Sequence, residues 1–256
     1  MILAIDIGNT NIVVGCVDSK KTYFIERIST DRSKTELEYA VMIKNVLDIY
    51  SIDPADLNGG IVCSVVPQIT QIVRIAAEKI LHSDVMVLGP GIKTGMNILM
   101  DNPAQVGSDL IADAVGAIAE YPAPLIIFDM GTATTVCVVD SKKNYIGGMI
   151  LPGVRTALDA LTARAAQLSG IDLVPPKRII GKNTVECMRS GVINSNAATV
   201  DGLITRIQDE MGCKATVVAT GGLAKSIIPY CREKVILDDD LLLKGLRIIH
   251  RRCTGK

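Results

Sequence analysis

One short pattern occurs twice in this chain of 256 residues, and it constrains the fold more than any other feature. Residues 5–11 and residues 128–135 each place a single Asp at the end of an apolar run, followed two positions later by Gly and then by hydroxyl or amide residues. β-Branched residues follow both copies, so each copy predicts a strand, a tight turn and a returning strand. The duplication predicts two similar domains, at residues 1–118 and 119–256.

The turn in each copy has chemistry suited to a polyphosphate. Glycine lets backbone N–H groups approach an anion, and hydroxyl and amide side chains add donors beside them. The carboxylate is a ligand for Mg²⁺, directly or through water. A single hairpin with Asp and Gly is most often only a hairpin. Two of them, near the starts of the two halves, indicate duplicated domains that face one nucleotide.

Composition and charge narrow the functional classes. The chain has 27 basic and 27 acidic residues, so no general field favours nucleic acid or an anionic membrane. Trp is absent and aromatic residues make up 3%, which disfavours a base-stacking surface. Hydrophobic residues make up 48% and charged residues 21%, which predicts a folded protein rather than a disordered chain.

Cysteine and histidine spacing gives no sign of a zinc site. The seven cysteines lie scattered in apolar stretches without any Cys-x-x-Cys, which predicts reduced thiols in a cytoplasmic protein. His82 and His250 are too far apart for a zinc motif. Asp6 interrupts the first apolar run and no basic segment precedes it, so we expect no signal peptide. No stretch approaches the roughly 18 apolar residues of a membrane span, so we expect no membrane partner.

Apolar periodicity predicts the same order of elements in both halves. In the first half the expected strands are 2–7, 11–17, 22–28, 60–66 and 85–88, and the expected helices are 35–50, 67–81 and 108–120. In the second half they are strands 125–130, 133–139, 144–150 and 215–219, and helices near 153–168, 184–211, 222–230 and 240–252. Three strands, helix, strand, helix, strand, run twice, is the plan of the actin, sugar-kinase and Hsp70 superfamily. We therefore expect an α/β fold of two RNase H-like domains facing a nucleotide cleft.

Further motifs, in order along nearly the whole chain, resemble those of the type III pantothenate kinase family. Residues 6–11 are similar to its first phosphate motif and residues 129–135 to its second. The other matching segments are 30–32, 64–67, 89–95, 147–153, 181–184 and 219–223. The resemblance implies phosphoryl transfer from ATP to pantothenate, the step that opens coenzyme A biosynthesis.

The resemblance also implies a nucleotide site built from both turns. Asp6 would hold Mg²⁺, most simply through water, and Asp129 would bind a monovalent cation, K⁺ or NH₄⁺. Gly221 and Gly222 would let the backbone pass close to adenosine. The implied ATP-binding set is Asp6, Ile7, Gly8, Asn9, Thr10, Asn11, Thr132, Gly221 and Gly222.

For the acceptor, the resemblance implies that Asp109 is the general base that takes the hydroxyl proton. The alternative from residue type alone is a helix-end charge, which stabilises a helix by roughly 0.3–1 kcal/mol. Thr184 would reach the acceptor in the neighbouring subunit's site, which implies a homodimer with a shared active site. The implied substrate-binding set is Met100, Gly107, Ser108, Asp109, Leu110 and Thr184.

Two members of that acceptor set depart from the family pattern. Leu110 stands where the family motif Gly-Ala-Asp-Arg has Arg, and Met100 stands where the family usually has Tyr. A charge-assisted hydrogen bond to a carboxylate contributes roughly 1.5–3 kcal/mol, which Leu110 cannot supply. Either Lys182 or Arg155 compensates, or the chain phosphorylates another small hydroxyl compound.

A third interpretation is a nucleotide-binding regulator of the Bvg accessory factor type, without kinase activity. Intact Asp6, Asp109 and Asp129 favour a kinase over this interpretation, because a protein that only binds a nucleotide has little need of a general base.

Overall fold

The first half of the chain builds one mixed sheet. Its strands are β1 (Ile2–Ile7), β2 (Asn11–Val17), β3 (Thr22–Ser29), β4 (Gly60–Ser64) and β5 (Val85–Val87). β1, β2 and β3 are antiparallel, β4 pairs parallel with β1 and β5 with β4, in the order β3-β2-β1-β4-β5. The helices that accompany this sheet are α1 (Glu36–Ile49), η1 (Pro54–Asp56), α2 (Pro67–Leu81), η2 (Pro103–Gln105), α3 (Ser108–Glu120) and α7 (Leu241–Thr254). The computed structural model describes residues 1–255.

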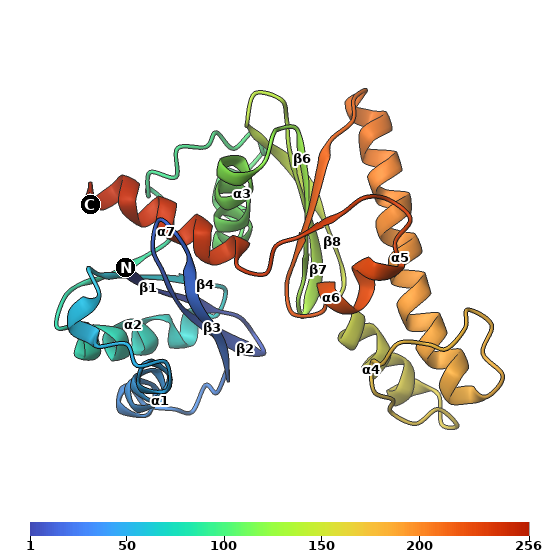
Figure 1. Cartoon of the computed structure of the whole chain (residues 1–256), viewed down its shortest axis with the longest axis horizontal. Coiled ribbons are helices and arrows are strands. Elements are labelled where there is room, and N and C mark those ends of the chain that lie inside the picture. The colour runs from blue at the N-terminus through green and yellow to red at the C-terminus, as the bar shows by residue number, and fades with distance from the viewer. Residues whose placement is uncertain (256) are drawn as a thin grey trace. The chain divides into compact units, whose positions relative to one another are not determined.

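The second half repeats this sheet (Figure 1). Its strands are β6 (Leu125–Met130), β7 (Ala133–Val139), β8 (Tyr145–Pro152), β9 (Thr216–Thr220) and β10 (Ile236–Leu237). Their order, β8-β7-β6-β9-β10, matches that of the first sheet strand for strand. Both sheets even carry a register shift at the same place, at Cys16/Val17 and at Val138/Val139. The predicted pair of RNase H-like domains is therefore confirmed.

The helices of the second half are α4 (Val154–Arg164), α5 (Thr184–Met211), α6 (Ala224–Ile227) and η3 (Ile228–Tyr230). α3 and α5 have the bounds that the sequence predicts, whereas α4 ends four residues earlier than expected. The single helix predicted over 222–230 is wrong, because Pro229 lacks the N–H that would continue an α-helix. β10 was not predicted, since two residues carry no periodicity.

Two compact units emerge from the contacts, and they differ from the predicted division at 118/119. The first unit holds residues 1–97, 101–120 and the C-terminal segment from Asp240; the second holds 98–100 and 121–239. α7 joins the first unit because it packs closely on α3. A Cβ at Gly245 would lie 1.8 Å from the carbonyl oxygen of Ala112, and only glycine permits this approach.

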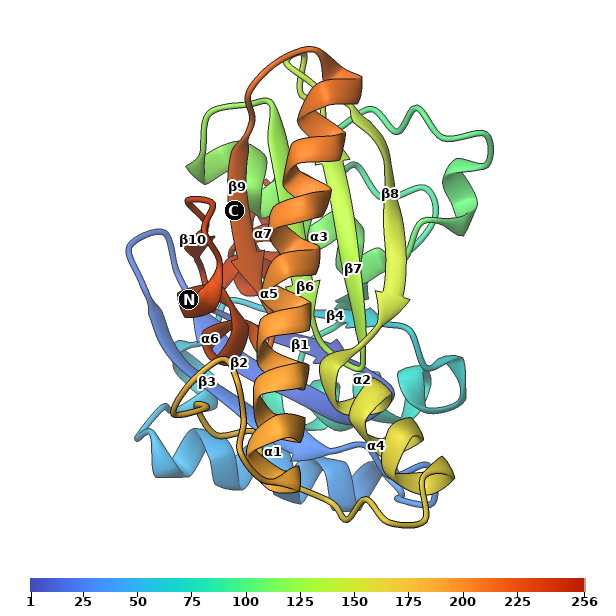
Figure 2. The same ribbon diagram turned by 90° about the vertical axis from the view of Figure 1, so that its right-hand side faces the viewer.

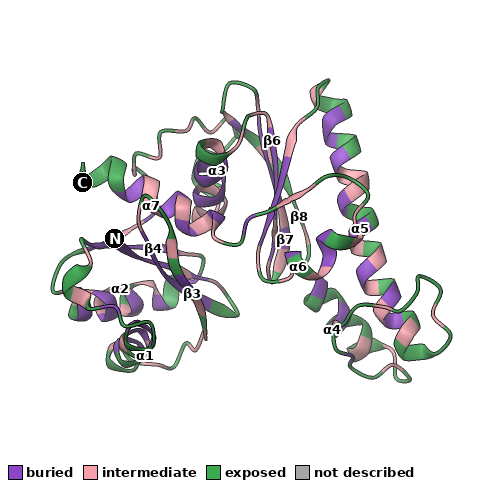
Figure 3. Cartoon of the chain, in the orientation of Figure 1, coloured by how far each residue is buried: buried purple, intermediate pink, exposed green. Residues whose placement is uncertain are grey.

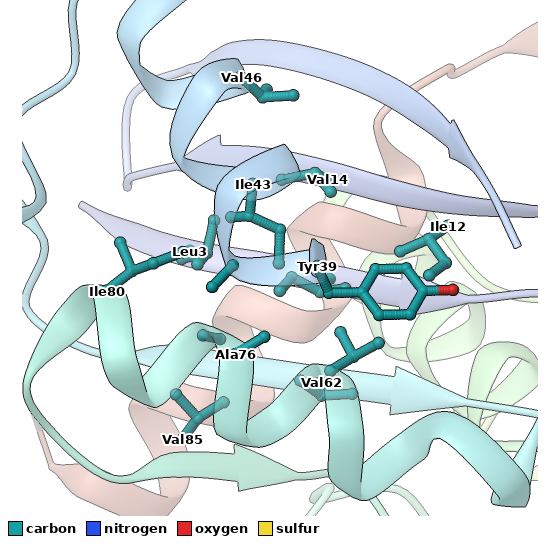
Figure 4. Packing of buried hydrophobic residues seen from close by; sticks show 14 of the residues in the cluster. Leu3, Ile12, Val14, Tyr39, Ile43, Val46, Val62, Ala76, Ile80 and Val85 are labelled. Carbon is teal, nitrogen blue, oxygen red and sulfur yellow. The ribbon is translucent and has the colours of Figure 1, made fainter. Parts of the chain in front are cut away.

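Apolar residues cover both faces of the first sheet. Leu3, Ile5 and Ile7 of β1 point to the face covered by α1 and α2, whereas Ile2 and Ala4 point to the face covered by α3 and α7. Figure 4 shows Leu3 packed among residues of α1 and α2. Because side chains alternate along a strand, the next residue in the second series is Asp6. The carboxylate of Asp6 therefore lies on the α3 side, at the carboxyl end of β1.

In the second unit, α5 lies along the sheet, as Figure 2 shows. Its buried residues, coloured purple in Figure 3, pack against β6 residues such as Ile126 and Phe128. Alternation again places the Asp of the motif, Asp129, on the opposite face from this cluster. Within residues 1–255, the structure has no helix with the length and hydrophobicity that crossing a membrane requires.

Candidate active site

The turn between β1 and β2 is tight and open to solvent. The N–H of Gly8 donates to the carbonyl oxygen of Asn11 at 3.0 Å, which closes the turn. Asn9, Thr10 and Asn11 are exposed. The turn thus exposes uncharged side-chain donors, of a kind that can bind an anion.

The segment after β3 braces this turn from one side. The N–H of Thr30 donates to the carbonyl oxygen of Thr10 at 3.1 Å, and Thr30 Oγ1 donates to that of Gly8 at 2.7 Å. Arg32 Nη2 donates to Asn9 Oδ1 at 3.5 Å. The sequence identifies Thr30 and Arg32 only as part of the 30–32 segment that matches the family, and it assigns them no role. Their contacts join residues about 20 positions apart, which local sequence patterns do not reveal.

A second brace brings α3 to the end of β4. Ser108 Oγ donates to the carbonyl oxygen of Ser64 at 3.1 Å and accepts from the Ser64 N–H at 3.4 Å. It also lies 3.1 Å from Cys63 Sγ, and Cys63 is paired with Asp6 in the parallel register of β1 and β4. Burial raises the pKa of the Cys63 thiol well above its usual range, and the negative charges of Asp6 and Asp109 raise it further. Both carboxylates therefore act on one buried thiol.

Asp109 stands in the first turn of α3, half-buried. Its Oδ1 accepts the N–H of Leu110 at 2.9 Å, so the helix-end role expected from residue type is present. Burial nevertheless raises the pKa of this carboxyl above its ordinary value of 3.8. A Cβ at Gly107 would lie 2.4 Å from Asp109 Oδ1, so glycine leaves the carboxylate the room that it occupies.

The turn between β6 and β7 closes in the same way, with the Gly131 N–H donating to the carbonyl oxygen of Ala133 at 3.0 Å. The N-terminus of α4 covers it. Thr156 Oγ1 donates to the carbonyl oxygen of Thr132 at 2.8 Å, and a Cβ at Gly153 would lie 2.2 Å from that same oxygen. The sequence analysis assigns Gly153 and Thr156 no role at this turn. The glycine that ends the 147–153 segment is the one sequence feature that could have indicated a close backbone approach there.

The turn after β9 approaches the second Asp. Gly221 has a φ of +92°, and a Cβ there would lie 2.3 Å from Asp129 Oδ1. Thr135 is paired directly with Asp129 between β6 and β7, so their side chains share a face. Thr135 Oγ1 is buried and makes no hydrogen bond within the described chain. Gly222 follows in the same turn and is exposed.

The predicted acceptor residues are divided between the two units. Gly107, Ser108, Asp109 and Leu110 lie together in the first unit, whereas Met100 and Thr184 belong to the second. Met100 lies in the loop before α3 and contacts β8, with its sulfur 3.8 Å from the Cβ position of Gly147. Thr184 is the exposed first residue of α5, directly after the N-cap Asn183.

Comparison with known proteins agrees with the motifs. The profile of the family described as type III pantothenate kinase matches residues 2–206. A relative of that name from an Exiguobacterium species is 44% identical over 98% of this chain and 99% of its own length. Another, from Moorella thermoacetica, is 45% identical over 99% of this chain and 100% of its own.

Among solved structures, the activator of 2-hydroxyisocaproyl-CoA dehydratase from Clostridium difficile, with bound ADPNP, is similar. The match has a TM-score of 0.56 and 14% identity, over 98% of this chain and 93% of that chain. At this level of identity the likeness shows the fold alone.

The raised pKa of Asp109 predicts a pH-dependent stability. When the pKa of a carboxyl is higher in the folded than in the unfolded protein, the folded state binds its proton more tightly. The free energy of unfolding therefore falls as pH rises from the ordinary pKa, 3.8, through the folded pKa. Asp109→Asn removes that loss. In urea denaturation series, the free energy of unfolding of Asp109→Asn minus that of wild type should therefore increase as pH is raised from about 3 to 7. Asp101→Asn, in the exposed preceding loop, is the control. A difference between Asp109→Asn and wild type that stays constant with pH would contradict the assignment.

Proposed function

The chain belongs to the type III pantothenate kinase family, and we propose that it transfers the γ-phosphoryl group of ATP to pantothenate. The products are ADP and 4′-phosphopantothenate, and the reaction opens coenzyme A biosynthesis. The observation that carries this proposal is the pair of glycine turns, each with an Asp at the carboxyl end of a central strand. The first of these turns lies in the same unit as Asp109. The helix that carries Asp109, α3, is hydrogen-bonded through Ser108 to β4, the strand next to β1.

The residues of the first turn fit a magnesium–nucleotide complex. Mg²⁺ binds proteins through one or two carboxylates and otherwise keeps waters and phosphate oxygens. Asp6 supplies such a carboxylate, and the described residues contain no group of three or more His, Cys, Asp or Glu that would form a complete cage. When bound, Mg²⁺ would neutralise charge on the β- and γ-phosphates. Asp6 would hold its hydration shell while the donors of residues 8–11 bind the phosphate oxygens.

Asp109 would act at the acceptor hydroxyl. The hydroxyl oxygen attacks the γ-phosphorus, its proton passes to the Asp109 carboxylate, and the bond from phosphorus to the β–γ bridging oxygen breaks to release ADP. The raised pKa of Asp109 makes the carboxylate a better proton acceptor than a solvated one. Because positioning contributes most of the catalysis in phosphoryl transfer, the Ser108 brace matters as much as the base.

Asp129 would bind a monovalent cation, K⁺ or NH₄⁺. The support is the buried Thr135 hydroxyl opposite Asp129, which makes no hydrogen bond within the described chain and offers an oxygen ligand. Thr132 would bind ATP from this turn, and Gly221 and Gly222 would line the adenosine. The assignment of these glycines is supported by the left-handed φ of Gly221 and by its close approach to Asp129, which leaves no room for a side chain.

Recognition of the pantothenate carboxylate requires a cation, which Leu110 does not provide. Arg155 Nη1 already donates to the carbonyl oxygen of Ile171 at 3.4 Å. Lys182 is exposed and lies two residues before Thr184, the residue that the family resemblance assigns to the acceptor. We therefore favour Lys182 over Arg155 as the cation that replaces the family arginine.

A homodimer would let Thr184 and Lys182 serve the partner's site. The support is three exposed isoleucines of the second unit: Ile150 is 79% exposed, Ile179 71% and Ile180 75%. Ile150 lies on β8, the edge strand of its sheet, and an exposed edge invites pairing with another chain. Ile179 and Ile180 are adjacent in the chain, and a partner subunit that covers them would remove two large apolar side chains from water.

The substrate assignment predicts that purified protein with Mg²⁺, K⁺ and ATP releases one ADP for each pantothenate phosphorylated. If Lys182 binds the carboxylate, kcat/KM should be about 10- to 150-fold lower for pantothenyl alcohol, which has none. Lys182→Gln should remove that preference, whereas Lys177→Gln, exposed in the same loop, should keep it. Turnover of pantothenyl alcohol alone would assign the site to a different acceptor.

The metal role of Asp6 predicts a selective loss. Asp6→Asn keeps the side chain's shape, so the melting temperature should change little, while Mg·ATP binding and turnover should fall. Calorimetric titration with ATP in the presence and absence of Mg²⁺ separates the two contributions. Equal Mg·ATP affinity and equal activity in variant and wild type would remove Asp6 from the metal site.

The shared site predicts complementation between two inactive variants. Asp109→Asn should lower turnover on the order of 10²- to 10⁴-fold, and Thr184→Val should also inactivate. Mixed subunits should regain part of the wild-type activity, because some hybrid dimers carry one intact site. Sedimentation velocity measures the oligomeric state, and a fully active monomer would contradict the dimer.

A further inference from the structure

We propose that Arg32 is a catalytic residue that neutralises charge on the terminal phosphate of ATP bound at the first turn. The proposal rests on the kinase function proposed above and adds a cationic group to it. Arg32 Nη2 donates to Asn9 Oδ1 at 3.5 Å, which holds the guanidinium against the exposed part of the turn. Arg32 is itself exposed, so a short rotation of its side chain reaches a phosphate there.

The backbone on either side of Arg32 is fixed. Thr30 makes its two hydrogen bonds to the turn, to Gly8 and Thr10. The fully buried Tyr39 of α1 accepts the N–H of Asp31 at 3.0 Å and donates to the carbonyl oxygen of Asp31 at 2.7 Å. The position of Arg32 beside the turn is therefore set by the core, and only its side chain has freedom to move.

The neighbouring carboxylate does not neutralise Arg32. Asp31 accepts from the Ser33 hydroxyl at 2.6 Å, the Ser33 N–H at 2.9 Å and Lys34 Nζ at 3.0 Å. These bonds, with those from Ser33 the largest cause, lower the pKa of Asp31 to about 2. Within residues 1–255 Arg32 forms no ion pair, so its charge remains available to a ligand, whereas that of Lys34 is already paired.

The chemistry at this turn needs such a charge. Residues 8–11 carry no charged side chain, and Asp6 is an anion, yet a triphosphate brings several negative charges to the site. A guanidinium presents paired N–H donors that match two phosphate oxygens. In the proposed step Arg32 donates these hydrogen bonds to the γ-phosphoryl oxygens as the bond to the leaving oxygen breaks, and it transfers no proton.

The experiment compares Arg32→Gln and Arg32→Lys with wild type. Arg206→Gln is the matched control, since Arg206 is an exposed arginine of α5 in the second unit and its substitution removes the same charge without touching the first turn. Arg32→Gln should lower kcat/KM for ATP by about 10- to 150-fold, the range of one charge-assisted contact. Arg32→Lys should recover part of that loss, and Arg206→Gln should behave as wild type.

Calorimetric affinities for a non-hydrolysable ATP analogue and for ADP provide a test that does not need an acceptor. If Arg32 contacts the terminal phosphate, Arg32→Gln weakens binding of the ATP analogue more than binding of ADP. Equal weakening of both, or unchanged binding and turnover, would overturn the proposal, because Arg32 would then only support the shape of the turn. A wild type that binds ATP but does not phosphorylate pantothenate would refute the proposed function while leaving this comparison valid.

Discussion

The parallel pairing of β1 with β4 is the constraint on which the first half of the site depends. It sets Asp6 opposite Cys63, and it turns both side chains to the face that α3 covers. A one-residue change of register would move Asp6 into the apolar cluster on the other face, where an unpaired carboxylate is costly. Ser108 then fastens α3 to the adjacent end of β4, so the position of Asp109 follows from the same pairing.

The duplicated fold gives two similar turns different surroundings. Both Asp residues follow a buried run with the same burial pattern, and both glycines close a hairpin at 3.0 Å. In the first unit, the segment after β3 braces the turn and α3 lies beside the Asp. In the second, α4 and the Gly221 turn take those positions. In the proposed function, the first turn binds metal and phosphate, and the second binds a monovalent cation and adenosine.

Patterns that are local in sequence predicted most of the fold. The apolar runs before each Asp and the β-branched residues after each turn predicted β1, β2, β6 and β7 at their observed bounds, and apolar periodicity placed α1 within one residue of each observed end. Periodicity could not show which helices share a sheet face, so α7 was assigned to the second domain although it packs on α3. The contacts of Thr30, Ser108 and Arg32 join distant segments and became visible only once the sheet had brought those segments together. The sequence also could not show that the six predicted acceptor residues are divided between the two units.

The most direct test of this account is a crystal structure of the protein with Mg²⁺, a non-hydrolysable ATP analogue and pantothenate. The account predicts an Asp109 carboxylate oxygen about 2.6–3.2 Å from the acceptor hydroxyl, with Asp6 facing the hydration shell of the metal. An acceptor hydroxyl out of reach of Asp109, with that carboxylate still bonded to the backbone N–H groups of α3, would contradict it.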